Sequence, residues 1–467
     1  MKKEKEEKKI RHFSKKTLIY SIGTIISSVA VLLAAPIFTR TLTTAEFGNY
    51  ELSYALIYLL CTVGFFDIFT STLRFMYGEK EENTENRNKA IYSSALLVII
   101  LIAILFFTVP ITALITPLPF VKAALFYGVL FSISKYYQII ARGCDRELEY
   151  SLGFSIYHII NLLTVCYLLV IKDYSSWSLL VAMGCGHIIE IIYLEYKLRL
   201  IINFKLRYID FHLMGRIFHF AVPLAVSAAG GWILNYYTNI KIVEILGADS
   251  NGIYSMSVNI ARSIPSITYG VLLAWQEIAF SFKGCEVDKR KFFSEAIENI
   301  IVTLSLLYVL FLSLSTLVVP YYLGPSYHGV LDVMYITCAC MTFETISNML
   351  ASIFGNSINS KPIMISIIIG AGIDLLTLTP LINSYGIIGA GYSSMIGFGI
   401  TCIIRAIWII GSEKLKINYI KILFYISIGV LGGYLCKSKD TVTLIMVAAV
   451  SGAMFLYYFR KGKKKDA

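Results

Sequence analysis

The chain has 467 residues, of which 57% are apolar and only 15% are charged, and its mean hydropathy is +0.70. Soluble domains carry about 25% charged residues, so this composition excludes a soluble enzyme, a disordered chain and a small disulfide-rich scaffold. The nine cysteines are scattered and form no CxxC pair, which favours core packing over metal binding. The class that remains is a many-helix membrane protein.

Apolar runs of spanning length repeat from residue 17 almost to the C-terminus. A helix needs about 20 mainly apolar residues to cross the hydrocarbon core of a bilayer. The sequence predicts fourteen spans, with approximate cores at 17–38, 50–74, 90–115, 119–141, 151–171, 176–198, 216–240, 253–280, 293–319, 329–353, 363–382, 386–409, 419–436 and 441–459. We therefore expect an all-α polytopic membrane protein.

The spans group into two six-helix lobes and a final pair. The predicted parts are a charged cytoplasmic tail, an N-lobe, a C-lobe, a C-terminal helix pair and a basic cytoplasmic tail, at 1–16, 17–206, 207–412, 413–460 and 461–467. If the spans alternate, most of the 41 lysines and arginines fall on the side of the N-terminus. This bias predicts that both termini are cytoplasmic.

The net charge of +11 is explained by membrane topology. The basic residues are spread over many short segments, so they serve topology and attraction to anionic lipid headgroups, and no nucleic-acid partner is expected. Membrane lipids are therefore expected partners. A monomer is the default expectation for the assembly.

Two segments repeat at an offset of 204 residues. Residues 39–57 and 243–261 each follow one span and open the next. The matching pairs are Leu42 and Leu246, Gly48 and Gly252, Tyr50 and Tyr254, and Ser53 and Ser257. Repeated halves are typical of transporters, which bind their cargo between them.

Several catalytic and cofactor signatures are missing. The chain has no G-x-x-x-x-G-K-[ST] loop and no HExxH motif, and its six histidines show no ligand-like clustering. We expect no catalytic residue, no metal and no cofactor, and therefore a transporter rather than an enzyme. Transport without an ATP site would draw on an ion gradient, the membrane potential or the gradient of the cargo.

Polar side chains recur at helical spacing within four spans. They are Ser255, Asn259, Arg262, Ser266, Tyr269 and Gln276 in span 8; Asp67, Ser71 and Arg74 in span 2; Thr17, Ser21, Thr24 and Ser28 in span 1; and Ser227, Gly231, Asn235 and Thr238 in span 7. Polar groups at membrane depth face protein or water. One hydrated cavity would explain all four stripes, and tight helix packing through small residues is the alternative.

Arg262 is the strongest single candidate. A guanidinium fits a phosphate bidentately, so Arg262 could hold an anionic headgroup within the membrane, or it could pair internally with Asp67, Glu277 or Asp374. Arg40 and Lys241, near the outer end, could receive an anion or act as interfacial anchors. The predicted cavity residues are Arg262, Arg40, Asp67, Arg74, Lys241, Asn259, Tyr269 and Gln276.

Asp374, in span 11, is the candidate for ion coupling. It could bind a cation or a proton, pair with an arginine, or be a packed polar residue. Glu190 and Glu344 have the same ambiguity.

Several segments in order resemble the Wzx-like polysaccharide flippases of the multidrug/oligosaccharidyl-lipid/polysaccharide exporter superfamily. The segments are PIFTRTL (36–42), AEFGNY (45–50), RGCDR (142–146) followed by Tyr150-Ser151, FAVPL (220–224), GWIL (231–234), LG (246–247), GIY (252–254) and YGIIGA (385–390). They extend over positions 14–410. Two departures are Thr238–Lys241, where members often carry an acidic residue followed by a basic one, and Asp374, where many carry Asn.

The resemblance implies a two-lobed helical bundle working by alternating access. It also implies a cargo: an oligosaccharide repeat unit on a polyprenyl pyrophosphate, flipped across a bacterial cytoplasmic membrane for capsule or O-antigen-type polysaccharide. A polysaccharide polymerase and glycosyltransferases are candidate partners. Tyr54, Tyr58, Tyr236, Tyr237 and Tyr269 are candidate sugar contacts.

Four other readings stay open at this point. They are a cation-coupled drug or small-molecule exporter of the same superfamily, a flippase for the peptidoglycan lipid precursor, a membrane glycan polymerase or ligase, and a scaffold without transport. A polymerase or ligase needs a large outside loop with paired catalytic residues, which the sequence lacks. A drug exporter favours acidic cavity residues over basic ones.

Overall fold

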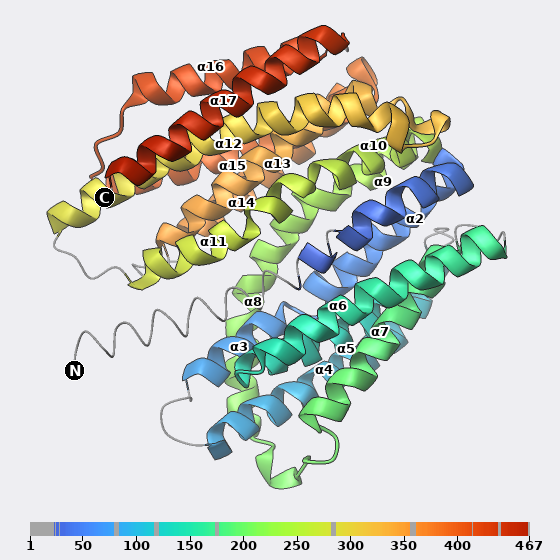
Figure 1. Ribbon diagram of the computed structural model, residues 1–467. Coiled ribbons are helices and arrows are strands. Elements are labelled where there is room, and N and C mark those ends of the chain that lie inside the picture. Colours follow the sequence, from blue (N-terminus) through green and yellow to red (C-terminus); the bar gives the residue numbers. More distant parts are fainter. Residues whose placement is uncertain are drawn as a thin grey trace. The chain divides into compact units, whose positions relative to one another are not determined.

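The computed structural model describes residues 23, 25–27, 29–78, 84–115, 121–172, 177–281, 286–354, 361–412, 414–437 and 440–465. Every regular element within these ranges is helical, which confirms the predicted all-α fold (Figure 1). Nine of the described helices are long and apolar enough to span a membrane, and one bent pair adds a tenth. The chain is a multi-pass membrane protein.

Helices coincide with the predicted spans along the first half of the chain. The first is the apolar helix Ile25–Thr41. It is followed by α2 (Thr44–Leu59), η1 (Leu60–Gly64), α3 (Ile68–Gly78), α4 (Thr84–Ile115), α5 (Val121–Gly143), α6 (Glu147–Val165), η2 (Cys166–Ile171), α7 (Trp177–Leu198), η3 (Leu206–Tyr208), α8 (Phe211–Trp232), η4 (Ile233–Tyr237) and α9 (Thr238–Leu246).

The second half continues the same pattern. Its elements are α10 (Ala248–Ala261), α11 (Ser263–Ser281), α12 (Glu286–Tyr322), η5 (Pro325–Tyr327), α13 (Val330–Phe354), α14 (Lys361–Tyr385), α15 (Ile387–Ser412), α16 (Tyr419–Cys436) and α17 (Thr441–Lys465). Within the described ranges, all fourteen predicted spans coincide with helix. The predicted tail 1–16 lies outside the described residues.

The chain divides by its packing into two compact units. We call Met1–Leu42 with Asn49–Trp232 the N-terminal unit, and Thr43–Gly48 with Ile233–Ala467 the C-terminal unit. The division falls between α8 and η4, inside the seventh predicted span. The lobe boundary predicted at 206/207 follows the six-span repeat and stays a prediction.

Two spans that the sequence predicts as continuous are broken: span 2 between η1 and α3, and span 8 between α10 and α11. Span 2 bends by 46° between η1 and α3, where Phe66 and Asp67 adopt left-handed backbone angles with φ of 54° and 45°. Left-handed backbone disfavours residues with a Cβ, although Asp tolerates it better than most. Asp67 directly precedes α3, and its Oδ1 accepts a hydrogen bond from the Thr70 hydroxyl at 2.9 Å.

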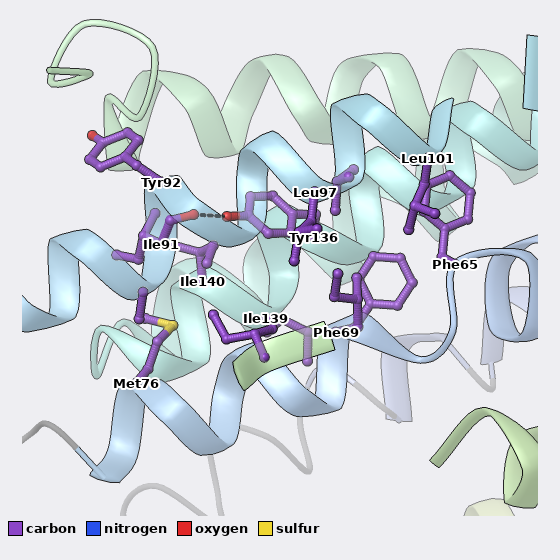
Figure 2. Close-up of a cluster of buried hydrophobic side chains, with 14 of the residues drawn as sticks. Phe65, Phe69, Met76, Ile91, Tyr92, Leu97, Leu101, Tyr136, Ile139 and Ile140 are labelled. Atoms are coloured by element: carbon purple, nitrogen blue, oxygen red, sulfur yellow. Dashed lines mark hydrogen bonds between the residues drawn. The ribbon is translucent and has the colours of Figure 1, made fainter. Parts of the chain in front are cut away.

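The core of the N-terminal unit forms where α3, α4 and α5 pack together. Figure 2 shows Phe65 and Phe69 from the region of the bend beside Leu101 of α4 and Ile139 of α5. The Tyr136 hydroxyl donates a hydrogen bond to the Ile91 carbonyl (Figure 2). Burying a large apolar side chain stabilises a soluble fold by about 1.5–3 kcal/mol. Within a bilayer, close packing of this kind is what joins the helices.

The C-terminal unit has its own core. Trp275 of α11 packs with Phe293 of α12 and Ile353 of α13, and its indole N–H donates to the Met349 carbonyl at 2.8 Å. The last two helices, α16 and α17, pack along α12 (Figure 1). A Cβ on Gly432 would lie 2.6 Å from Val309, so α16 approaches α12 closely. Small residues permit such approach between membrane helices.

Candidate functional site

Arg262 lies at the break between α10 and α11, inside the eighth predicted span. Its backbone N–H still donates to the Val258 carbonyl at 2.9 Å, and its carbonyl accepts from Ser266 at 3.2 Å. Pro265 follows three residues later and has no N–H to offer the Ala261 carbonyl. A proline near the start of α11 therefore marks the break that the polar periodicity alone does not reveal.

Aromatic and amide side chains of the C-terminal unit hold the Arg262 guanidinium. Nη1 donates to Asn259 Oδ1 at 3.1 Å, and the guanidinium lies 5.2 Å from the ring centroid of Tyr236 in η4. Cation–π contacts of this kind are worth about 0.5–2 kcal/mol, more when desolvated. Arg262 is half-buried. Arg262 and Asn259 thus contact each other at a spacing of three residues, and Tyr236, named above as a candidate sugar contact, adds a ring beside the guanidinium.

Glu344 of α13 is the acidic group near this arginine. Its Oε1 lies 3.5 Å from Asn235 Nδ2, and its carboxylate interacts electrostatically with both Arg262 and Arg405. Glu344 is therefore a counter-charge within reach of both arginines, and Arg262 is the half-buried one of the two. A half-buried guanidinium keeps donors that an anion can accept.

Arg405 of α15 is the buried member of this set. Only 3% of it is exposed. Its Nε donates to Ser366 Oγ at 2.9 Å, and its Nη1 donates to the carbonyl and hydroxyl of Ser347, both at 2.9 Å. These contacts join α13, α14 and α15, so Arg405 has a packing role that its position near a helix end does not reveal.

The other predicted residues of the C-terminal unit are placed differently. Lys241 of α9 pairs with Glu244 one turn later, with Nζ 2.7 Å from Oε2. Tyr269 of α11 is 37% exposed. The Gln276 side chain lies outside the described residues, as do those of Glu277 and of the predicted span 1 stripe.

Three predicted site residues belong to the N-terminal unit. Arg40 is exposed near the end of the first helix. Asp67 directly precedes α3 at the bend, as described above. Arg74 of α3 is exposed, and its guanidinium lies 5.3 Å from the ring centroid of Phe220 in α8. The cavity expected from the four polar stripes stays a prediction.

Asp374 is fully buried in α14. Its Oδ1 accepts a hydrogen bond from the Ser393 hydroxyl of α15 at 2.6 Å, and its Oδ2 has no hydrogen-bond partner in the described part of the chain. The Ser393 hydroxyl also lies 2.8 Å from Thr377 Oγ1 and 2.9 Å from the Asp374 carbonyl. Asp374 therefore lies among hydroxyl and carbonyl oxygens, and within the described ranges only one of its carboxylate oxygens accepts a hydrogen bond.

A second hydroxyl group borders this region. Ser394 Oγ lies 3.1 Å from Thr238 Oγ1 and 3.5 Å from the Tyr254 hydroxyl. Gly397 permits the approach, since a Cβ there would lie 3.0 Å from Asp374 Cβ. Residues from α9, α10, α14 and α15 thus meet around the buried carboxylate. Oxygen atoms of this kind suit a proton or a small hard cation.

The repeated segments meet within the C-terminal unit. α2 begins at Thr44 and α10 at Ala248, an offset of 204 residues, as the repeat predicts. A Cβ on Gly48 would collide with the Ala248 carbonyl, and a Cβ on Gly252 would collide with the Thr44 carbonyl. The repeat therefore brings equivalent residues into a reciprocal contact. Each glycine follows a small residue four positions earlier, which is the pattern for close helix crossing.

Side-chain hydrogen bonds also join the start of α2 to its neighbours. Asn251 Nδ2 donates to the Gly48 carbonyl at 2.7 Å, and Thr44 Oγ1 donates to Asp249 Oδ1 at 2.5 Å. The Tyr327 hydroxyl donates to the Thr43 carbonyl at 3.0 Å. The first turn of α2 is thus bonded to α10 and η5.

Solved transporter structures share this fold. An inward-facing multidrug resistance MATE family transporter of the MOP superfamily matches with a TM-score of 0.68 and 14% identity, over 84% of this chain and 99% of its own. The lipid II flippase MurJ in an inward closed conformation matches with a TM-score of 0.67 and 15% identity, over 95% and 99%. A MOP superfamily transporter from Pyrococcus furiosus, described as having a binding pocket of reverse polarity, matches with a TM-score of 0.60 and 15% identity, over 86% and 97%.

At these identities the likeness is one of fold. No curated protein matches the sequence. The sequence model of the family described as "Polysaccharide biosynthesis protein" matches residues 13–275, which is more than half of the chain. That range ends within α11 and includes the Gly48 and Gly252 crossing and Arg262. The chain belongs to this family of polysaccharide biosynthesis proteins.

Proposed function

We propose that the protein flips polyprenyl-pyrophosphate-linked oligosaccharide repeat units across a membrane for the synthesis of surface polysaccharide, by alternating access. The observation that carries the proposal is Arg262, a half-buried cation inside the eighth predicted span that Asn259 and Tyr236 hold in place. The family and the transporter fold support the same reading.

The chemistry of the cargo matches this set. A pyrophosphate and a sugar headgroup cannot cross hydrocarbon unaided, because burying their charged and hydroxyl groups without partners costs several kcal/mol or more. Arg262 supplies a forked donor for phosphate oxygens. Asn235 and Asn259 supply amide groups for sugar, and Tyr236 supplies a hydroxyl and a ring face. The prenyl tail needs no polar partner and can stay in lipid.

Two other cargoes stay open within transport. MurJ is a lipid II flippase and the MATE relative is a multidrug resistance transporter, so a peptidoglycan precursor or a cationic drug is the alternative. The Arg262 guanidinium, a cation within the span, favours a pyrophosphate-linked lipid over a cationic drug.

The family description favours surface polysaccharide over peptidoglycan. The proposed location is a bacterial cytoplasmic membrane with both termini cytoplasmic, as the positive-inside bias predicts. A polymerase and glycosyltransferases of the same polysaccharide are the proposed partners.

Asp374 is the proposed ion-coupling residue. It is buried beside the hydroxyls of Ser393 and Thr377, and among the residues that the structure describes only one of its carboxylate oxygens is hydrogen-bonded. Binding a proton or a small cation there neutralises a carboxylate that is expensive to bury alone. Coupling follows if the cation binds one conformation of the transporter more tightly than the other.

Replacing Asp374 with Asn should uncouple transport from the ion gradient. The amide keeps the shape and can still bond to Ser393, but it cannot take up a cation or titrate. We expect the D374N variant to lose accumulation of flipped lipid against a gradient and to keep exchange between equal pools. Asp440→Asn is the control, because Asp440 is an exposed acid before α17 that bonds to Thr443. Gradient-driven transport by D374N equal to the wild type would remove Asp374 from coupling.

Deletion of the gene tests the proposed cargo in the cell. We expect surface polysaccharide to be lost and lipid-linked repeat units to accumulate with their sugars facing the cytoplasm, where mass spectrometry of the extracted lipids identifies them. Complementation with the wild-type gene should reverse both effects. Unchanged polysaccharide with raised sensitivity to cationic drugs would instead support the drug-exporter alternative.

A further inference from the structure

Two arginines of the N-terminal unit each stack on a phenylalanine of the other's helix. The guanidinium of Arg74 on α3 lies 5.3 Å from the ring centroid of Phe220 on α8. Reciprocally, the guanidinium of Arg216 on α8 lies 5.4 Å from the ring centroid of Phe75 on α3. The two rings meet edge to face, with centroids 6.1 Å apart and an interplanar angle of 85°. The four side chains therefore form one chain of contacts between α3 and α8 that begins and ends with an arginine.

The core of the N-terminal unit holds these side chains in place. Met76, next to Phe75, and Ile217, next to Arg216, are fully buried in that core. The helices α3 and α8 pack against each other there (Figure 1). Since the neighbouring residues point into the core, the arginines point away from it, and both are exposed. Two exposed cations are thus mounted on a rigid part of the protein.

Stacking leaves the hydrogen-bond donors of both guanidiniums accessible. A guanidinium stacks through its flat face, whereas its five N–H groups lie in its plane. Among the residues that the structure describes, Arg74 and Arg216 contact aromatic rings and take part in no hydrogen bond or ion pair. Asp210, the acid at the start of α8, instead accepts a hydrogen bond from the Leu213 N–H at 3.0 Å and interacts with Lys89. Oriented donors are therefore left for a ligand.

The other exposed arginines of this unit with a described partner differ in this respect. Arg146 donates from Nη1 to Glu149 Oε1 at 3.0 Å, so its charge is already paired. Arg207 donates from Nη2 to the Tyr208 hydroxyl at 3.2 Å, so it uses part of its donor edge within the protein. Only the pair on α3 and α8 combines a stacked face with a donor edge that the described residues leave accessible.

The place of the pair in the sequence indicates which anion it meets. Arg74 ends the second predicted span and Arg216 begins the seventh, and the positive-inside bias puts both on the side of the N-terminus. Ends of spans lie at the level of the lipid headgroups, and anionic phospholipids supply phosphate groups there. A planar guanidinium donates two parallel hydrogen bonds to phosphate oxygens. Arg262, in contrast, lies inside a span, where only a translocated headgroup passes.

We propose that Arg74 and Arg216 form a binding site for the phosphate groups of anionic phospholipids, on the predicted cytoplasmic side of the N-terminal unit. Phe75 and Phe220 are positioning residues that fix the two guanidiniums with their donor edges toward the headgroups. The site goes beyond the proposed function, because it needs no cargo and holds whichever cargo the protein carries. It also gives Arg74 a role at the membrane surface in place of the predicted cavity.

Native mass spectrometry of the full-length protein tests the site without any cargo. Protein purified in detergent is stripped of lipid and titrated with dioleoyl phosphatidylglycerol, and the bound lipids are counted by mass. We expect the double variant Arg74→Gln/Arg216→Gln to lower the affinity for the most tightly bound phosphatidylglycerol about tenfold or more, because it removes hydrogen bonds to a charged group. Dioleoyl phosphatidylcholine, which has no net charge, should bind more weakly and equally to the wild type and the variant.

Two further variants test the role of the rings. Phe75→Leu and Phe220→Leu keep both positive charges and an apolar side chain but remove the flat surface under one guanidinium. We expect each to lower the affinity for phosphatidylglycerol about two- to fivefold, since the guanidinium loses its fixed orientation. A general attraction between basic residues and anionic lipid would not change in these variants. Wild-type affinity in both would therefore overturn the assignment of a built site.

Arg146→Gln is the matched control. Arg146 is an exposed arginine of the same unit and of the same predicted side, but its charge is paired with Glu149. We expect this variant to bind phosphatidylglycerol as the wild type does. The proposal is overturned if the double variant keeps wild-type affinity, or if Arg146→Gln lowers the affinity as much as Arg74→Gln alone. Binding of a polyprenyl pyrophosphate that depends on both arginines, with no such dependence for phosphatidylglycerol, would assign the pair to the cargo and would also overturn it.

Discussion

Replacing Arg262 with alanine is expected to abolish lipid flipping while the protein still inserts and folds. The substitution removes the guanidinium over Tyr236 and the hydrogen bond to Asn259. Hydrogen bonds to a charged group contribute about 1.5–3 kcal/mol each, so losing them to a pyrophosphate lowers affinity about tenfold to more than a hundredfold. Lysine at this position should restore part of the activity. It keeps the positive charge but lacks the planar guanidinium that can donate two parallel hydrogen bonds to a phosphate. The measurement is flipping at matched protein amount in the membrane.

Arg207→Ala is the matched control for Arg262. Arg207 also lies over a tyrosine, 5.1 Å from the ring centroid of Tyr208, but it is an exposed residue of η3 in the N-terminal unit. Removing it deletes an arginine–tyrosine contact without touching the proposed site, so activity should stay at the wild-type level. Wild-type flipping by Arg262→Ala would contradict the role that we assign to Arg262.

Glu344→Gln separates two explanations of an Arg262 defect. If Arg262 serves only to neutralise Glu344, then removing the glutamate charge should be as damaging as removing the arginine. If Arg262 binds the anionic cargo, the Glu344→Gln variant keeps that arginine and has more net positive charge, so it should still flip lipid. We expect the second result. Loss of flipping in both variants, with rescue in the double variant, would assign Arg262 to internal pairing instead.

Enlarging Gly48 or Gly252 is expected to disrupt the crossing of α2 and α10. Alanine at either position places a Cβ against a backbone carbonyl of the other helix, and a backbone cannot move aside as a side chain can. Overpacking of this kind costs about 1–3 kcal/mol, and valine should cost more than alanine. We expect a lower unfolding temperature and weaker bonding of Asn251 to Gly48. Thermal unfolding of the purified variants measures the first effect.

Gly399→Ala controls for the helix itself. Gly399 lies inside α15, and a Cβ there would meet no atom within 4 Å. Alanine is the better helix former by about 0.5–1 kcal/mol, so this substitution should leave stability unchanged or raise it. A loss of stability at Gly399 equal to that at Gly48 would show that the glycines matter for helix propensity and not for the crossing.

The spans were predictable because bilayer thickness fixes their length and composition. Apolar runs of about 20 residues leave few alternatives to a membrane helix, and each of them coincides with a helix in the described ranges. The repeat was also readable, since Thr44 and Ala248 begin equivalent helices. That the repeated glycines touch each other did not follow from the repeat, because an offset in sequence carries no information on contact.

The breaks in spans 2 and 8 show where hydropathy stops being informative. Both segments are apolar on average despite their polar stripes, so a hydropathy window runs across the breaks. Local signals were present: Pro265 lacks a backbone N–H, and Asp67 precedes Thr70 at the spacing of a helix cap. The left-handed backbone of Phe66 has no such signal, because only the packing of the bend holds a bulky residue there.

The candidate sites were predictable as single residues but not as clusters. Arg262 and Asp374 stand out because a charge in an apolar span is costly. Glu344 and Ser393, their neighbours, come from other helices, and a single sequence does not say which helices meet.

The measurement that tests the account most directly is flipping by the purified protein in proteoliposomes that contain a polyprenyl-pyrophosphate-linked oligosaccharide. A membrane-impermeant reagent modifies only sugars exposed on the outer leaflet. We predict that the wild-type protein makes the inner-leaflet sugars accessible, while Arg262→Ala leaves them protected. Continued protection with the wild-type protein, together with transport of a cationic drug by the same vesicles, would contradict the flippase proposal.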